Sequence, residues 1–447
     1  MAEIKRILIA NRGEIALRAI RTIQEMGKEA VAVYSTADKD ASYVQIADAA
    51  ICIGAPSSAD SYLNIPAIIG AAEISGCDAI FPGYGFLSEN EHFVEICGHH
   101  KLKFIGPTSA VMVMMADKSK AKDVMIAAKV PVVPGSDGAI DDIEDAKKRA
   151  KVVGYPVILK AASGGGGRGM RVVEEESYLE NAFLACEAEA ITAFGDGTIY
   201  MEKFIKNPRH IEVQVLADSH GNAVHIGERD CSMQRRHQKL IEESPAMALK
   251  PETREAMHEA AVRAAKYVNY EGAGTFEFLL DANNDFYFME MNTRLQVEHT
   301  VSEMVSGLDL IEWMIRIAEG ETLMDQSEIT LTGHAIECRI TAEDPVKFLP
   351  CPGKIKEWIS PGGLGVRLDT HAHANYIVPT TYDSMIAKLI VHATDRDKAI
   401  ARMKRSLKEF TISGIKTTIP FHIDMMQNPD FKNNDFDTNY IGRYMNL

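Results

Sequence analysis

Two glutamates, one on each side of a predicted turn, are residues whose types and spacing could do chemistry. Residues 274–280 and 286–292 alternate as strands do, and the intervening 281–285, Asp-Ala-Asn-Asn-Asp, are good turn formers. A hairpin centred on this turn would place Glu277 directly opposite Glu290. Opposed carboxylates lie only ~5 Å apart at their Cβ atoms and repel each other unless a divalent cation intervenes. Carboxylate and amide oxygens suit Mg²⁺, so the expected metal ligands are Glu277, Glu290 and Asn292.

The alternative for this hairpin is a solvated face whose charges point into water. The phenylalanines that flank the glutamates, Phe276, Phe278 and Phe288, disfavour that alternative.

A glycine-rich loop suggests a second kind of chemistry, contact with an anion. Residues 157–160, Val-Ile-Leu-Lys, form a short apolar strand, and 163–170 read Ser-Gly-Gly-Gly-Gly-Arg-Gly-Met before strand character resumes at 172–173. Such a loop costs entropy and is tolerated where backbone N–H groups approach an anion closely. Lys160 at the strand end can bring a positive charge to a phosphate. The loop is not a Walker motif, and the alternative of a flexible hairpin tip is less favoured than phosphate contact.

Donors also gather in two further segments. Residues 228–239, ERDCSMQRRHQK, are rich in basic side chains, although a solvated charged loop is the alternative there. In 292–299, NTRLQVEH, four polar side chains alternate, so an extended chain would project them to one side: Asn292, Arg294, Gln296 and Glu298. A metal ligand, a guanidinium, an amide and a carboxylate in a row make a poor core face and a good face for handling an anion.

The elements that must position these residues begin with alternating strands and helices. Apolar strand patterns at 7–10, 30–34, 79–81 and 104–105 alternate with helical patterns at 14–26, 65–75 and 90–100. Repeated βα units predict a doubly wound parallel sheet. The turn after the first strand lacks G-x-G-x-x-G, so we do not expect nucleotide binding there; Gly13 instead permits a tight turn.

The rest of the chain reads as two further parts. A helical connector over 108–130 leads to a compact segment at 132–204 that holds the glycine loop, and 205–330 contains strands and the charged motifs. Residues 331–447 open with strands and include a helical run at 396–410. We therefore expect three domains of mixed α/β and α+β structure, over 1–114, 115–330 and 331–447.

Composition excludes several classes of protein. The chain has 447 residues and a formal net charge of −15, which argues against nucleic acid or an anionic membrane as a partner. Its seven cysteines form no C-x-x-C pair, so neither a disulfide framework nor a zinc site is indicated. Neither a signal peptide nor an apolar run of membrane-spanning length is found. The expectation is a cytoplasmic protein.

Taken together, the motifs resemble those of the ATP-grasp enzymes and, within them, the biotin carboxylases. The resemblance covers nearly the whole chain through IANRGEIALR (9–18), FPGYGFLSEN (81–90), KAASGGGGRGM (160–170), RHIEVQVLAD (209–218), ERDCSMQRRHQK (228–239), EMNTRLQVEH (290–299) and GHAIECRITAEDP (333–345). The second and fifth of these are specific to biotin-dependent carboxylases. The resemblance implies an N-terminal doubly wound sheet, an ATP-grasp domain with a mobile glycine-loop lid, and a β-rich C-terminal biotin carboxylase domain.

The resemblance also implies roles for matching residues. ATP phosphates would be held by Lys118, Lys160, Gly164, Gly165, Gly166, Gly167, Gly169 and Met170. The rest of the nucleotide site would comprise Glu202, Lys203, Ile205, His210, Gln234, His237 and Leu279, with Mg²⁺ or Mn²⁺ on Glu277, Glu290 and Asn292. Bicarbonate would be bound by Lys239, Arg294, Gln296 and Val297, and biotin would face Arg339 and Tyr84. Glu298 would be the general base, and the catalytic set would be Glu298, Arg294, Lys239 and Arg339.

The activity implied by the resemblance is ATP- and bicarbonate-dependent carboxylation of biotin through carboxyphosphate. As part of an acetyl-CoA carboxylase this would be the first step of malonyl-CoA formation for fatty acid synthesis. The nearest match to a biotinyl Ala-Met-Lys-Met hairpin, residues 402–405, lies in a helical run, so we expect biotin on a separate carrier protein. Carboxyltransferase subunits and a homodimer are implied. The alternatives are a subunit of a propionyl-CoA or pyruvate carboxylase, another ATP-grasp carboxylate–amine ligase, and a non-catalytic nucleotide-binding protein.

Overall fold

The computed structural model describes residues 3–136, 138–161, 170–194 and 196–445. The chain divides into two compact units. The larger comprises Met1–Val130, Arg209–Phe278 and Glu290–Leu447, and the smaller Pro131–Pro208 and Leu279–Met289. Among the described residues, no helix combines the length and the apolar character that crossing a membrane requires.

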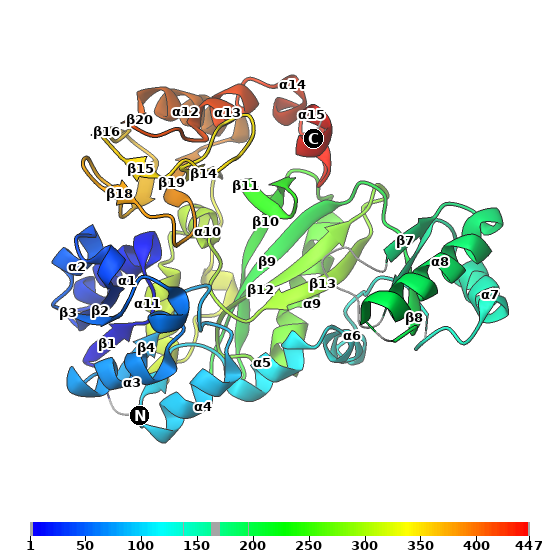
Figure 1. Cartoon of the computed structure of the whole chain (residues 1–447), viewed down its shortest axis with the longest axis horizontal. Coiled ribbons are helices and arrows are strands. Elements are labelled where there is room, and N and C mark those ends of the chain that lie inside the picture. The colour runs from blue at the N-terminus through cyan, green and yellow to red at the C-terminus, as the bar shows by residue number, and fades with distance from the viewer. Residues whose placement is uncertain (1–2, 137, 162–169, 195, 446–447) are drawn as a thin grey trace. The chain divides into compact units, whose positions relative to one another are not determined.

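The larger unit opens with a five-stranded parallel sheet in the order β3-β2-β1-β4-β5 (Figure 1). Its strands are β1 (Arg6–Ile9), β2 (Glu29–Ser35), β3 (Ala49–Gly54), β4 (Ala79–Phe81) and β5 (Lys103–Phe104). Alternate strand residues face opposite sides: one side packs on α1 (Gly13–Glu25) and α2 (Ser42–Ile46), the other on α3 (Ile65–Ile74) and α4 (Glu91–His99). The prediction of a doubly wound sheet is confirmed, and Gly13 has the positive φ of 70° that its tight turn requires.

The predicted connector is helical, as α5 (Ser109–Ala116) and α6 (Lys118–Ala127). Short 3₁₀ turns occupy Thr36–Asp38 and Ser58–Asp60 in the N-terminal part and Gln326–Glu328 farther along the chain.

An eight-stranded sheet in the order β13-β12-β9-β10-β11-β14-β19-β17 carries the charged motifs. Its strands are β9 (Arg209–Ala217), β10 (Ala223–Arg235), β11 (Gln238–Ser244), β12 (Gly272–Leu280), β13 (Phe286–Asn292), β14 (His334–Thr341), β17 (Val366–Thr370) and β19 (Met385–Ala393). Because β11 pairs with β14, the sheet continues across residue 330, where the sequence suggested that a domain begins.

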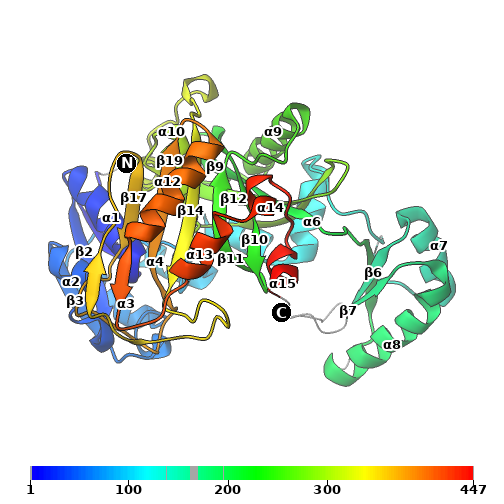
Figure 2. The ribbon, with the colours of Figure 1, turned by 90° about the horizontal axis from the view of Figure 1, so that it is seen from above.

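Helices and short strands complete the larger unit, and several of the helices lie against this sheet (Figure 2). They are α9 (Pro251–Tyr267), α10 (His299–Ser306), α11 (Leu310–Ala318), α12 (Arg396–Glu409), α13 (Ile419–Met425), α14 (Pro429–Lys432) and α15 (Tyr440–Tyr444). Two small antiparallel pairs join β15 (Gly353–Lys354) to β18 (Ile377–Val378) and β16 (Glu357–Ile359) to β20 (Thr411–Ser413). The helical run predicted at 396–410 is therefore confirmed.

The smaller unit contains a three-stranded antiparallel sheet, β7-β6-β8. Its elements are α7 (Ile143–Val153), β6 (Val157–Ala161), β7 (Met170–Val173), α8 (Glu176–Phe194) and β8 (Ile199–Lys203). Both helices pack on one face of the sheet, where Val157, Leu159 and Met201 are fully buried. The other face carries Lys160 and Glu202, so its charged side chains remain partly exposed.

Buried ion pairs, as well as apolar contacts, join the elements of the larger unit. Glu243 on β11 accepts hydrogen bonds from Arg396 of α12, with Nε at 2.7 Å, and its Oε2 lies 2.8 Å from Nε2 of His334 on β14. Burial alone would raise the pKa of the Glu243 carboxyl, but the bonds and charges of His334 and Arg396 lower it to about 2.

We expect Glu243→Gln to destabilise the protein by about 3 kcal/mol at neutral pH, because removing one charge of a buried pair leaves its partners uncompensated. Since the folded pKa lies below the ordinary value, the stabilisation by Glu243 is complete above about pH 4.5 and is lost as the pH falls toward 2. Denaturant unfolding of wild type and variant between pH 7 and 3 measures this, and the two stabilities should converge in acid. A constant difference across that range would contradict the assignment.

Candidate functional site

Lys239 lies at the centre of a buried group of carboxylates in the larger unit. Its Nζ is 2.6 Å from Glu212, 3.1 Å from Glu277 and 2.5 Å from Glu298. These side chains come from β9, β12 and the start of α10, and Lys239 itself is on β11. Burial opposes the charge on Lys239, but the surrounding carboxylates raise its pKa well above the ordinary value. The ammonium group therefore stays charged.

Glu277 is surrounded by hydrogen-bond donors. Its Oε1 accepts from Asn292 Nδ2 at 2.8 Å and from Gln296 Nε2 at 2.6 Å, in addition to Lys239. Although burial would raise the pKa of Glu277, Lys239 and His210 lower it well below its usual range. Side chains from other strands therefore supply a positive charge beside Glu277, and the binding of a divalent cation there stays a prediction.

The predicted turn over 281–285 is confirmed. Asp281 N–H donates to the Asp285 carbonyl at 2.9 Å, and Asn284 has a positive φ of 72°. Glu290 is half-buried on β13, and its direct opposition to Glu277 stays a prediction.

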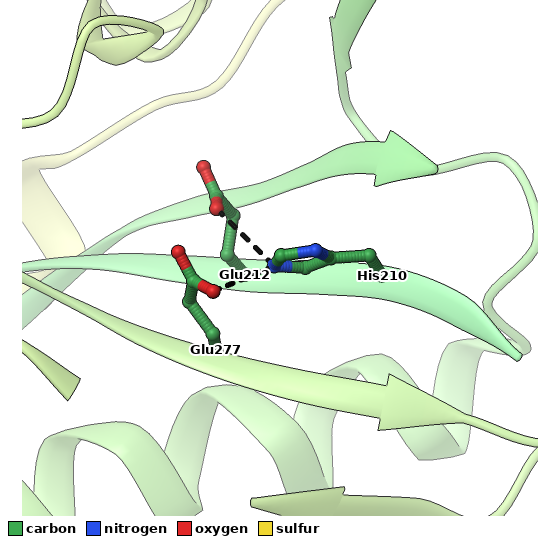
Figure 3. Close-up of side chains that lie close together, drawn as sticks. All are labelled: His210, Glu212 and Glu277. Carbon is green, nitrogen blue, oxygen red and sulfur yellow. Dashed lines mark ion pairs between the residues drawn. The ribbon is translucent and has the colours of Figure 1, made fainter. Parts of the chain in front are cut away.

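His210 and Glu212 extend this group along β9, beside Glu277 of β12 (Figure 3). His210 Nε2 lies 2.9 Å from Glu277 Oε2 and 3.7 Å from Glu212 Oε2. This buried nitrogen is thus paired with the Glu277 carboxylate and has no further polar partner closer than Glu212 within the described residues. The three side chains bring their ligand atoms within 4.8 Å of one another, as a small divalent cation would require.

The segment that follows β13 brings its polar side chains to the group without being extended. The strand ends at Asn292 and the chain then bends and turns until α10 begins at His299. The prediction of an extended, alternating segment is therefore wrong. The contacts arise from the bends: Gln296 reaches Glu277, and Arg294 donates to Asn292 Oδ1 at 2.9 Å and to Glu89 at 2.8 Å.

Glu298 lies between two cations at the end of this segment. One oxygen accepts from Lys239, and the other accepts from Arg339 Nη2 at 3.0 Å. Burial would raise its pKa, but Lys239, Arg339 and Arg229 lower it well below the ordinary value of a glutamate. Glu298 is thus an ionised, almost fully buried carboxylate.

Arg339 also lines a pocket of about 480 Å³ together with Tyr84 and Val297. Tyr84 donates to the buried Glu14, and the Val297 carbonyl accepts from Lys388 at 2.9 Å. Three residues that the resemblance assigns to biotin or bicarbonate therefore meet in one cavity that adjoins Glu298.

Gln234 and His237 lie on the β10–β11 hairpin. The turn between these strands is Arg236–His237, both with positive φ, of 47° and 65°. Gln234 Nε2 lies 3.4 Å from His210 Nδ1, and Gln234 also lines a polar pocket of about 300 Å³ with Arg235, Thr438 and Asn439. The hairpin explains why this basic segment is not a solvated loop: β10 is buried along most of its length.

The smaller unit holds another set of the predicted residues. Lys160 and Glu202 form an ion pair at 2.5 Å, and Met170 is the strand partner of Lys160. Lys203 instead donates to the carbonyls of Gly154 and Tyr155. Ile205 follows β8 and Leu279 lies near the end of β12; both are half-buried.

Several predicted residues lie outside the described part. These are Gly164, Gly165, Gly166, Gly167 and Gly169. Lys118 is the first residue of α6, but its side chain is not described.

Sequence reasoning missed several members of the buried group. Arg229 is fully buried and donates to Glu212 at 2.5 Å and to Gln296 at 2.6 Å, and Glu242 accepts from Arg339. One signal was available: in 209–218 polar residues alternate with Ile211, Val213 and Val215. All of these alternating residues are buried or half-buried, and a buried strand with a polar face indicates a site.

The chain is similar to known proteins along almost its whole length. Three family models match the chain: "Biotin carboxylase, N-terminal domain" over 3–112, "Carbamoyl-phosphate synthase L chain, ATP binding domain" over 117–326, and "Biotin carboxylase C-terminal domain" over 337–443. A biotin carboxylase of Nostoc sp. is 56% identical over 98% of both chains.

Two solved structures are similar over almost the whole chain. The biotin carboxylase–β-γ-ATP complex of Campylobacter jejuni is 68% identical, with a TM-score of 0.91 and 99% of both chains covered. The biotin carboxylase domain dimer of Hydrogenobacter thermophilus 2-oxoglutarate carboxylase, in complex with MgADP, ADP and bicarbonate, is 48% identical, with a TM-score of 0.88 over 99% of this chain and 98% of that one. The chain belongs to the biotin carboxylase family of ATP-dependent ligases.

Proposed function

We propose that this protein is the biotin carboxylase component of an acetyl-CoA carboxylase, which uses ATP and bicarbonate to carboxylate biotin on a separate carrier protein. The observation that carries the proposal is the position of Glu298. It is an ionised carboxylate between Lys239 and Arg339, at a pocket that Tyr84 and Val297 also line.

Glu298 serves as the general base for bicarbonate. Lys239, Arg294, Gln296 and the Val297 backbone hold the anion, so the negative charge of bicarbonate competes with Glu298 for Lys239. As Lys239 turns toward bicarbonate, the pKa of Glu298 rises and the carboxylate becomes a better base. This competition would allow Glu298, whose pKa is depressed by Lys239 and Arg339, to take a proton when bicarbonate is bound.

The residues present fit a divalent cation and a nucleotide. Glu277, Glu290 and Asn292 offer the oxygen ligands that Mg²⁺ or Mn²⁺ prefers, and the buried His210 Nε2 beside Glu277 has no hydrogen-bond partner in the described chain. The bound metal would neutralise charge on ATP phosphates. ATP would contact Lys118, Lys160, the glycine loop with Met170, and the adenine-side residues Glu202, Lys203, Ile205, Gln234, His237 and Leu279.

The proposed reaction moves one phosphoryl group and then one carboxyl group. Glu298 takes the bicarbonate proton, a bicarbonate oxygen attacks the γ-phosphorus of ATP, and ADP leaves with the electron pair of the broken P–O bond. Carboxyphosphate then separates into CO₂ and phosphate, and the phosphate takes the proton from biotin N1′. Arg339 stabilises the resulting enolate, which attacks CO₂. Exclusion of water protects carboxyphosphate, a task for the lid proposed at 132–204.

The final carboxyl acceptor depends on another polypeptide. Acetyl-CoA is the acceptor that we propose, with malonyl-CoA formation for fatty acid synthesis as the result, in a cytoplasmic homodimer that works with a carrier protein and carboxyltransferase subunits. The similarity to a 2-oxoglutarate carboxylase domain favours a second candidate, a subunit of a carboxylase whose acceptor is a keto acid such as pyruvate. The proposed domains remain 1–114, 115–330 and 331–447.

The reaction class is tested by measuring ATP cleavage with bicarbonate, with and without free biotin. Cleavage that requires bicarbonate and increases with biotin supports a biotin carboxylase. Cleavage that instead requires an amine and another carboxylate would identify a different ATP-grasp ligase.

Glu298→Gln keeps the size of the side chain but removes the proton acceptor, so biotin carboxylation should fall by roughly 10²–10⁴-fold. The dissociation constant of ATP should stay close to that of wild type. Glu303→Gln is the matched control, since Glu303 is a buried glutamate of α10 that pairs with Arg18 and Arg367, away from Lys239. A normal carboxylation rate in Glu298→Gln would place the base elsewhere.

Glu277→Gln should raise the Mg²⁺ concentration needed for half-maximal activity by roughly 10- to 100-fold, because the loss of a residue that supports a metal site lowers metal affinity by about that factor. The metal-free variant should also be less stable by about 1–3 kcal/mol, because Lys239 loses a buried carboxylate. Glu228→Gln, on β10 beside His258 and Arg254, is a control whose Mg²⁺ dependence should not change. Unchanged Mg²⁺ dependence in Glu277→Gln would remove Glu277 from the metal site.

A further inference from the structure

Two fully buried glutamates lie close to Arg339, and neither takes part in the reaction proposed above. Glu242 on β11 and Glu337 on β14 are direct cross-strand partners in an antiparallel pair. Directly opposed side chains of such a pair share one face of the sheet, with Cβ atoms ~5 Å apart. Two carboxylates buried this close repel each other strongly unless one of them is neutral.

The bonds of the two carboxyls differ. Glu242 Oε1 accepts from Arg339 Nε at 2.6 Å and lies 2.5 Å from Nη2. The hydrogen-bond partner of Glu337 is the hydroxyl of Thr300, and no ion pair of Glu337 is found in the described chain. Each carboxyl keeps one buried oxygen without a partner there, Glu242 Oε2 and Glu337 Oε1. A proton on Glu337, donated to Glu242, would satisfy both atoms.

The charges that face the pair agree with this assignment. Glu242 faces Arg339, Lys239 and Glu298, and Glu337 faces Lys388, Arg339 and Glu242. Lys388 is already bound to Glu14 at 3.1 Å and to the Val297 carbonyl. Burial is the largest influence on both carboxyls: it raises the pKa of Glu242 to about 7 and that of Glu337 well above its ordinary value.

Glu242 also determines how Arg339 meets the proposed base. Arg339 donates from Nε to Glu242 Oε1, its Nη2 also lies 2.5 Å from that oxygen, and Glu298 accepts one hydrogen bond from Nη2, at 3.0 Å. A guanidinium without this anchor would be free to form a two-pronged pair with Glu298, which would both neutralise the base and draw Arg339 out of its place at the pocket.

We infer that Glu337 is protonated and shares its proton with Glu242, and that the Glu242 carboxylate is the positioning residue that holds Arg339 between the base and the biotin pocket. The part that concerns biotin rests on the proposed function. The protonation of Glu337 and the anchoring of Arg339 by Glu242 do not depend on the proposed function.

The proton is tested by infrared spectroscopy at neutral pH. A protonated carboxyl has a carbonyl stretch at higher frequency than a carboxylate, so the difference between wild type and Glu337→Gln should show the loss of one such band. Because an amide can replace the protonated carboxyl as donor to Glu242, biotin carboxylation by Glu337→Gln should stay within about twofold of wild type. A difference spectrum that shows loss of a carboxylate band instead would overturn the inference.

The anchoring is tested with Glu242→Gln, which should lower biotin carboxylation by roughly 10²-fold, since small misplacements of an active-site group cost that much, while the ATP dissociation constant stays unchanged. Glu243→Gln is the matched control: it alters the adjacent buried glutamate, which bonds His334 and Arg396, and should lower stability without lowering the activity of the folded enzyme. Equal loss of activity in both variants would reduce Glu242 to a structural role.

Crystal structures of wild type and Glu242→Gln separate this inference from the proposed function. The guanidinium of Arg339 should move toward Glu298 in the variant, whatever reaction the enzyme catalyses. An unchanged Arg339 would overturn the anchoring role. If wild type fails to carboxylate biotin while Arg339 moves as expected, the proposed function is wrong and the anchoring role stands.

Discussion

The contact between the Lys239 ammonium and three buried carboxylates is the interaction on which the site depends. Glu212, Glu277 and Glu298 come from three different elements, and each lies within 3.1 Å of the same nitrogen. Removing these charges from water is costly, and only close opposite charges compensate that cost. The strands that carry Lys239, Glu212 and Glu277 must therefore keep their register, because a shift of one residue would turn each of these side chains to the other face of the sheet.

The same constraint extends outward through arginines. Arg229 is fully buried and joins Glu212 to Gln296, while Arg339 joins Glu298 to Glu242. A guanidinium offers five donors in a rigid fork, so it can hold two acceptors at fixed positions in a way that a lysine cannot. Glu298 is consequently placed by a network in which most donors have acceptors, and such networks are rigid. A rigid site would suit the proposed reaction, which depends on holding bicarbonate and a phosphoryl group in line.

Charge balance also explains how a strongly ionised site can do proton chemistry. The cations around Glu298 keep its pKa low. If Glu298 is the base that we propose, a bound anion would take part of this positive charge and the basicity of Glu298 would rise. Glu242 contributes in the opposite sense, because it takes part of the charge of Arg339 away from Glu298. In the mechanism that we propose, the balance between these carboxylates, rather than any one pKa, would determine when the proton moves.

Local patterns in the sequence were sufficient to predict several of the elements that carry the candidate site. The doubly wound sheet follows from apolar strands that alternate with amphipathic helices, and the turn at 281–285 follows from its Asp and Asn residues; both depend on interactions between near neighbours. The family could be identified because whole motifs such as 81–90 and 228–239 stand intact in the sequence.

The tertiary structure alone decided the charge pairing. Nothing local in 292–298 indicates that the chain bends there, and nothing near Glu277 indicates that Lys239, 38 positions away, supplies its counter-charge. The pairing of Glu242 with Glu337, 95 positions apart, is likewise set by the register of β11 against β14. Long-range pairing of this kind depends on the packing of the whole sheet, and the energy of a buried charge depends on every group around it. For this reason the sequence determined which residues could act, and only the folded structure decided which of them are charged and which of them meet.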